Sequence, residues 1–156
     1  MPDPHAATVA DEVAQRLATC TAANGYTFEV TTVSRRLLQD PDTYTHGTVV
    51  LAWGALRRDD AWQGTAPWTR WTHDLDLAII VRPAADDAQP LDLAILQAVR
   101  DVLHALNLPD CLGGLVDQVN VETVTPFDAA QAVSGASVQL SVVYRTNERD
   151  LAEPPE

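Results

Sequence analysis

Apolar and polar residues alternate over several stretches of the chain, with the period of two that is typical of a β-strand with one buried face. The clearest stretch lies near the C-terminus, where Val138, Leu140, Val142 and Tyr144 alternate with mostly polar neighbours. A different stretch, 48–53, is almost continuously apolar, which is typical of a central strand covered on both faces. The predicted strands are 26–31, 48–53, 71–81, 119–123 and 137–144.

Two further segments repeat apolar residues every three or four positions, the spacing of one helix face. The first stripe consists of Val9, Val13, Leu17 and Cys20, and the second of Leu91, Ile95, Val99, Val102, Leu103 and Leu106. Asn24-Gly25 is the predicted end of the first helix, because glycine tolerates the left-handed backbone conformation that ends helices. Pro90 is the predicted start of the second. The expected helices are 7–24 and 90–107, and the polar face of the second comprises Gln97, Arg100, Asp101 and His104.

Helical and strand patterns together predict an α+β fold, a mixed sheet of four to five strands with two main helices packed on it. The chain has 156 residues, which is enough for one domain with its own core. We expect a single domain over 1–156, with a core at about 7–150 and a loose acidic tail at 151–156. Polar segments at 35–45, 54–69 and 82–89 are predicted connections.

The net charge of −12 argues against a surface that binds nucleic acid by neutralising phosphates. The same acidity fits a plain soluble protein as well as one whose partner is basic. Cys20 and Cys111 have no zinc-site spacing and are expected to be two reduced, semi-buried thiols. No signal peptide is visible at the N-terminus, and no apolar run reaches the roughly 20 residues that cross a bilayer. The expectation is a chain made and kept in a cytosol, with no membrane partner.

Asp74 and Asp76 are the sharpest candidates for chemistry. Two carboxylates at i and i+2 of a strand share a face, a spacing that holds magnesium in nucleotidyltransferases. The glycine-serine turn that should precede them is missing, and Gly54-Ala55 lies about twenty residues upstream. The plainer interpretation is that acidic residues occupy the solvent-exposed face of a strand. We therefore predict that Asp74 and Asp76 are ordinary solvent-exposed carboxylates. No catalytic, metal or cofactor site is predicted elsewhere.

Tryptophans gather in the predicted connection between the second and third strands. Trp62 and Trp68 lie in it and Trp71 beside it, together with Arg57, Arg58 and Arg70. Large aromatic residues in a long connection either fold back on the sheet as a lid or contact another subunit. Both interpretations stay open for this segment. If it is an interface, Trp62 and Trp68 are the expected anchors, with the three arginines around them.

The order of short motifs along the chain resembles a known family. Ala23-Asn24-Gly25-Tyr26 follows the first helix, and Val49-Val50-Leu51 forms an apolar strand before the long connection. Leu112-Gly113-Gly114-Leu115 follows the second helix, and the last strand ends in Tyr144-Arg145-Thr146. Over residues 7–150 this order resembles the tail terminator (minor tail, or tail completion) proteins of long-tailed bacteriophages and related phage-like particles. The aromatic connection is longer than the family pattern.

The resemblance implies a virion structural protein and not an enzyme. Such proteins form a homo-oligomeric ring, typically a hexamer, on the head-proximal end of the tail tube. The ring stops addition of tail tube protein and joins the tail to the head–tail connector or neck protein, while DNA passes only as cargo. Assembly would take place in the host cytoplasm.

Two other functions remain as alternatives at this point. The first is a metal-dependent nucleotidyltransferase-like enzyme that uses Asp74 and Asp76. The second is a small cytosolic binding module of toxin–antitoxin type, which would be encoded beside a dedicated partner. Neighbouring genes for a tail tube protein and a tape-measure protein would favour the tail terminator over both.

Overall fold

The computed structural model describes residues 5–35, 44–59, 68–82, 90–127 and 134–147. The elements are α1 (His5–Ala18), the 3-10 helix η1 (Ala22–Asn24), β1 (Thr32–Ser34), β2 (Thr48–Arg58), β3 (Trp68–Ile80), α2 (Leu91–Leu106), the 3-10 helix η3 (Leu108–Asp110), α3 (Cys111–Gly114), β4 (Gln118–Phe127) and β5 (Gly135–Asn147). The five strands form one sheet in the order β1-β2-β3-β5-β4. β1 pairs with β2 in parallel, and all other pairs are antiparallel. The predicted α+β class is confirmed.

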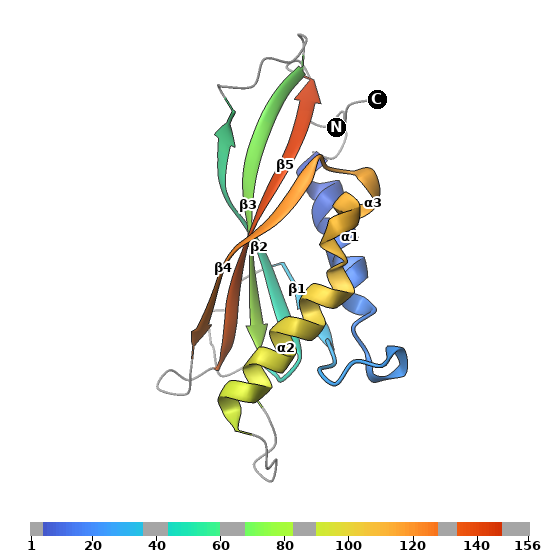
Figure 1. Ribbon diagram of the computed structural model, residues 1–156, viewed down its shortest axis with the longest axis vertical. Coiled ribbons are helices and arrows are strands. Elements are labelled where there is room, and N and C mark those ends of the chain that lie inside the picture. Colours follow the sequence, from blue (N-terminus) through green and yellow to red (C-terminus); the bar gives the residue numbers. More distant parts are fainter. Residues whose placement is uncertain (1–4, 36–43, 60–67, 83–89, 128–133, 148–156) are drawn as a thin grey trace.

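The helices lie on one face of the twisted sheet (Figure 1). On β3 the side chains of Leu75, Leu77 and Ile79 are buried on that face, opposite Leu140, Val138 and Ala136 of β5. The predicted helix stripes pack against them and are also buried; their core members are Val9, Val13, Leu17, Ile95, Val99, Val102 and Leu106. The alternating strands and the helical stripes therefore supply two sides of one core, which is where hydrophobic burial stabilises the fold.

The first helix ends six residues earlier than predicted, at Ala18. Thr19 donates its hydroxyl to the Arg16 carbonyl, and the chain then turns into η1. Gly25 does adopt the left-handed conformation (φ 90°), but it ends η1 and not the main helix. The prediction that Gly25 ends a helix is therefore correct, but the helix that it ends is η1 and not α1.

The predicted strand at 26–31 is wrong. Phe28 and Val30 are buried as the alternation suggests, but the backbone N–H groups of Thr27 and Phe28 donate to the Asp101 carboxylate of α2 (3.1 and 2.8 Å). Val30 N–H donates to the Cys20 carbonyl (2.8 Å). These backbone donors are therefore satisfied without a neighbouring strand, and the ladder begins only at β1. Asp101 itself is buried, contrary to the prediction that it faces water.

Both cysteines are free thiols, as predicted. Cys20 is buried and donates to the Phe28 carbonyl (3.2 Å), while Cys111 is partly buried. Burial, as the largest cause, raises the pKa of Cys20 to about 11. At neutral pH this side chain is therefore a protonated, unreactive thiol that packs as a small apolar group.

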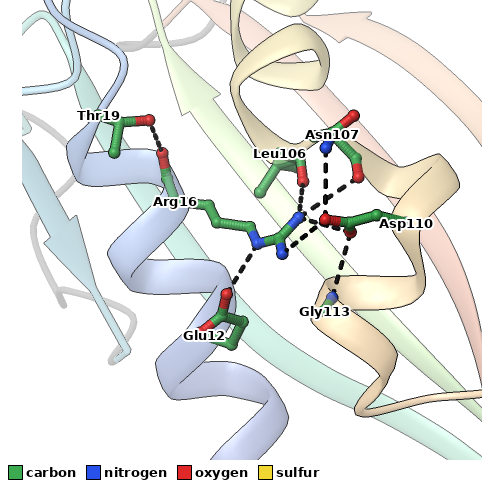
Figure 2. A network of polar contacts seen from close by, with 7 residues as sticks. All are labelled: Glu12, Arg16, Thr19, Leu106, Asn107, Asp110 and Gly113. Carbon is green, nitrogen blue, oxygen red and sulfur yellow. Dashed lines mark hydrogen bonds and ion pairs between the residues drawn. The ribbon is translucent and has the colours of Figure 1, made fainter.

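Arg16 ties α1 to the turn that follows α2 (Figure 2). Its guanidinium donates to both Asp110 oxygens (2.8 and 3.0 Å), to Glu12 (2.9 Å) and to the Leu106 carbonyl (2.8 Å). The carbonyl groups at a helix C-terminus lack helical partners and carry partial negative charge, so a guanidinium stabilises them. The turn itself has left-handed backbone at Asn107. This network holds the C-terminal end of α2 and the following turn against α1.

Candidate interaction site

The connection predicted at 54–69 belongs to the sheet at both of its described ends. β2 continues to Arg58 and β3 begins at Trp68, with a bulge between Trp53 and Leu56. Arg57, Arg58, Trp68 and Arg70 therefore lie on strands, not in a loop as predicted. The search for alternating apolar and polar residues missed this extension of β2, because the bulge changes which residues face the core. Trp62 lies outside the described residues, so the choice between lid and interface stays open for it.

The end of the β2–β3 hairpin is held by local polar contacts. Asp59 N–H donates to the Arg70 carbonyl (3.0 Å), and the Arg70 guanidinium lies 3.8 Å from the Asp59 carboxylate. Trp71 donates its indole N–H to the Thr146 hydroxyl of β5 (2.8 Å). Trp68 is half-buried. These contacts hold the strands of the hairpin together up to its last described residues.

Asp74 is not the solvent-exposed acid that the sequence predicted. It is buried (6% exposed) under the guanidinium of Arg57, which donates to both carboxylate oxygens at 2.9 Å. This bidentate pair lowers the pKa of Asp74 and raises that of Arg57. The arginine comes from β2 and the carboxylate from β3, so the pair fixes the two strands beside the bulge.

Asp76 lies on the same face of β3 and is half-buried. Burial raises its pKa, and the negative charge of Asp74 adds to the effect. The i, i+2 spacing therefore does place both carboxylates together, but Arg57 occupies one of them. Among the described residues, no group of three or more His, Cys, Asp and Glu is placed to hold a metal ion.

We expect Asp74→Asn to lower the thermal unfolding temperature at pH 7, because it removes the ionic partner of Arg57. The folded pKa of Asp74 is below its unfolded value of about 3.9, so the pair stabilises the fold above that pH. This stabilisation disappears as the pH falls through the lowered folded pKa, and the variant should lack that part of the acid dependence. Thermal unfolding at pH 7 and in steps below pH 4 measures both effects.

Asp76→Asn is the matched control, and it should be neutral or slightly stabilising because it removes a carboxylate with a raised pKa. Calorimetric titration of the wild type with magnesium should show no saturable heat. A saturable magnesium site that is lost when Asp74→Asn and Asp76→Asn are combined would contradict this account of Asp74 and favour the metal-dependent enzyme.

A buried aromatic cluster near the same end of the sheet was not predicted from the sequence. His73 stacks on Trp53 (ring centroids 3.9 Å apart) and shares a hydrogen bond of 2.9 Å with the Tyr144 hydroxyl. Burial lowers the pKa of His73 and raises that of Tyr144 to about 12, so both groups are neutral at pH 7. His5 contacts the Tyr144 ring edge-on and bonds to the Leu115 carbonyl (2.9 Å). The sequence did contain a signal that His73 is buried, because it lies two positions from Leu75 on β3 and therefore on the same face of the strand.

An uncovered apolar surface lies where α2 passes the edge strand β4. Among the described residues five large hydrophobic side chains are exposed: Leu93 (50%) and Leu96 (56%) on α2, Val121 (43%) and Val124 (38%) on β4, and Leu56 (44%) on β2. A hollow of about 470 Å³ lies between the two elements, and we call it the α2–β4 groove; it is lined by Leu91, Asp92, Ile95, Leu96 and Pro126. A signal for exposed apolar residues on α2 was present in the sequence, since Leu93 and Leu96 are apolar but lie off the core stripe of α2.

The strand beside this groove has an open side. β4 stands at the end of the sheet order and pairs with β5 alone within the described part of the chain. Its register shifts between Val121 and Thr123, which turns the later residues relative to the earlier ones. An apolar hollow next to an edge strand is typical of a protein–protein contact.

Comparison with known proteins does not assign a family. No protein-family model matches the chain, and a search of curated proteins gives no match. Within the described ranges, none of the helices has both the length and the apolar character needed to cross a membrane.

Proposed function

We propose that this chain is a virion assembly protein of the tail terminator type. The structural observation that supports an assembly role is the mainly apolar α2–β4 groove, whose lining includes the exposed Leu96, because apolar hollows of this kind are typical of surfaces that a neighbouring protein covers. The choice of a tail terminator among assembly proteins rests on the order of motifs along the sequence.

The order of elements is compatible with that choice. The helix, the apolar strand β2, the central strand β3, the second helix and the closing strand β5 follow one another as the resemblance implies. Arg145 and Thr146 of the closing motif are part of β5, and Thr146 accepts the hydrogen bond from Trp71. In this proposal the motif therefore helps to hold the hairpin end of the sheet.

In the proposed mechanism several copies close into a ring, with six as the expected number, on the head-proximal end of the tail tube. The ring covers the surface to which the next tube subunit would add, and it offers a new surface to the connector or neck protein. The net charge of −12 suits a ring through which DNA slides, because like charges do not adhere. No chemical step is needed, and no cofactor is proposed.

Deletion of the gene from its phage or prophage tests the proposal. Tube protein polymerises without a cap, so the expected result is overlong, headless tubes beside filled, tailless heads in electron micrographs. Supplying the wild-type gene in trans is the control and should restore joined particles of uniform length. Head-attached tails of normal length in the deletion would contradict the proposal.

A further inference from the structure

We propose that the turn at residues 107–115 is a strained clasp, which the Arg16–Asp110 ion pair keeps closed and which opens as a local unit while the core stays folded. The clasp joins α2 to β4 through η3 and α3, and it contains the motif Leu112-Gly113-Gly114-Leu115. It is independent of the proposed function.

The backbone of the clasp is left-handed over most of its length. The four residues of α3, Cys111–Gly114, have φ of 56°, 55°, 74° and 87°, and Asn107 has φ of 48°. Glycine adopts this conformation readily, but a residue with a β-carbon is disfavoured in it. Cys111 and Leu112 are two such residues in succession. Backbone of this kind persists only where the surrounding structure holds it, and it is typical of segments that switch between conformations.

Contacts with both ends of α1 hold the clasp closed. Arg16, in the last turn of α1, donates to both carboxylate oxygens of Asp110 (2.8 and 3.0 Å), and Asp110 accepts the Gly113 N–H (3.2 Å), as Figure 2 shows. His5, the first residue of α1, bonds to the Leu115 carbonyl (2.9 Å). The ion pair is therefore the link between α1 and the left-handed backbone itself.

The outer side of the clasp has room for movement. Among the described residues, a β-carbon at Gly114 would meet nothing within 4 Å, and one at Gly113 would meet only the Arg16 guanidinium at 3.6 Å. The Asp110 side chain is 41% exposed, and water competes for the partners of an exposed ion pair. Strained backbone thus opposes a pair that water can reach, and a segment of this kind opens locally more readily than the core does.

Opening has two measurable consequences. The Leu115 and Val116 N–H groups both donate to the Cys111 carbonyl, so they lose their shared acceptor when the left-handed turn is lost. The Cys111 thiol, which is partly buried and donates to the Asp117 carbonyl (3.4 Å), becomes accessible. Neither consequence requires the strands of the core to separate.

Native-state hydrogen exchange of the purified chain, followed by NMR, tests whether the opening is local. The Leu115 and Val116 amides are the reporters, and the Leu140 amide in the middle of β5 is the reference for global unfolding. We expect the reporters to exchange at least about a hundredfold faster than Leu140. Low concentrations of urea should speed exchange at Leu140 and not at the reporters, because local opening exposes little surface. Reporters with the rate and the urea dependence of Leu140 would overturn the proposal.

Two substitutions separate the ion pair from the strain. Asp110→Asn should speed exchange of the reporters about tenfold, the factor that corresponds to about 1.4 kcal/mol. Cys111→Gly should slow it about threefold, because glycine relieves the left-handed strain. Asp117→Asn is the matched control, since Asp117 also pairs with an arginine through both oxygens (Arg145, 2.9 and 3.1 Å) but lies outside the clasp. It should leave the reporters unchanged. Equal effects of Asp110→Asn and Asp117→Asn, or faster exchange in Cys111→Gly, would overturn the clasp.

The rate of thiol labelling with a disulfide reagent gives a second readout that needs no NMR. Asp110→Asn should speed labelling of Cys111 about tenfold, while Cys20, which is buried, stays unlabelled in the folded chain. Labelling of Cys111 at an unchanged rate, or of both thiols together, would mean that the turn opens only when the whole chain unfolds.

Discussion

Replacing Leu75 with alanine is expected to lower the free energy of unfolding by about 2–5 kcal/mol. Leu75 is 1% exposed and lies at the centre of β3, opposite Trp53 of β2 and Leu140 of β5. Truncation leaves a cavity where the sheet meets the helices, and close-packed strands on both sides cannot collapse into it. Domains of this kind are stable by about 5–15 kcal/mol, so this one change removes a large part of the total.

The shift of the urea midpoint at unchanged slope measures this loss. Leu93→Ala is the control, because Leu93 is 50% exposed on α2 and should change stability by no more than about 0.5 kcal/mol. Equal effects of the two substitutions would mean that the helix-covered face of the sheet is not the core.

Gly135→Ala is expected to destabilise the fold by more than about 2 kcal/mol. Gly135 begins β5 with φ 155°, and a β-carbon there would lie 1.8 Å from the Ile79 carbonyl oxygen. The contact is with backbone of β3, which cannot move aside as a flexible side chain could. The start of β5 would have to leave β3, and the neighbouring hydrogen bond from Val81 N–H to the Ser134 carbonyl (2.9 Å) would be lost with it.

Gly114→Ala separates this clash from the general cost of replacing a glycine. Gly114 also has positive φ (87°), but nothing lies within 4 Å of a β-carbon there, so the expected cost is about 1 kcal/mol. Urea unfolding of both variants gives the comparison. A Gly135→Ala protein as stable as the Gly114→Ala protein would show that β3 and β5 are not as close as described.

The alternation of apolar residues predicted the buried faces of β3 and β5 because side chains on a strand point to opposite sides in turn. The same reasoning failed at 26–31, where the period of two is present but the backbone donors are taken by Asp101. A pattern of side chains predicts which residues are buried. It does not say where the backbone hydrogen bonds go, and those bonds decide whether a strand forms.

The candidate sites depended on distant pairings that no local pattern contains. Asp74 was recognised as unusual, but its partner Arg57 lies seventeen positions away and became a neighbour only because β2 continues past its bulge. The α2–β4 groove joins residues from α2 and β4 in the same way. Sequence reasoning could mark Leu96 as off the core stripe, and only the fold placed Pro126 of β4 near it.

The central claim is that this chain caps a growing tail tube. Its most direct test is electron microscopy of tubes assembled from the purified tube protein of the same particle, with and without the purified chain. The account predicts shorter tubes as the chain is added, with gold-labelled chain at one end of each tube. Tubes of unchanged length, without label at their ends, would contradict it.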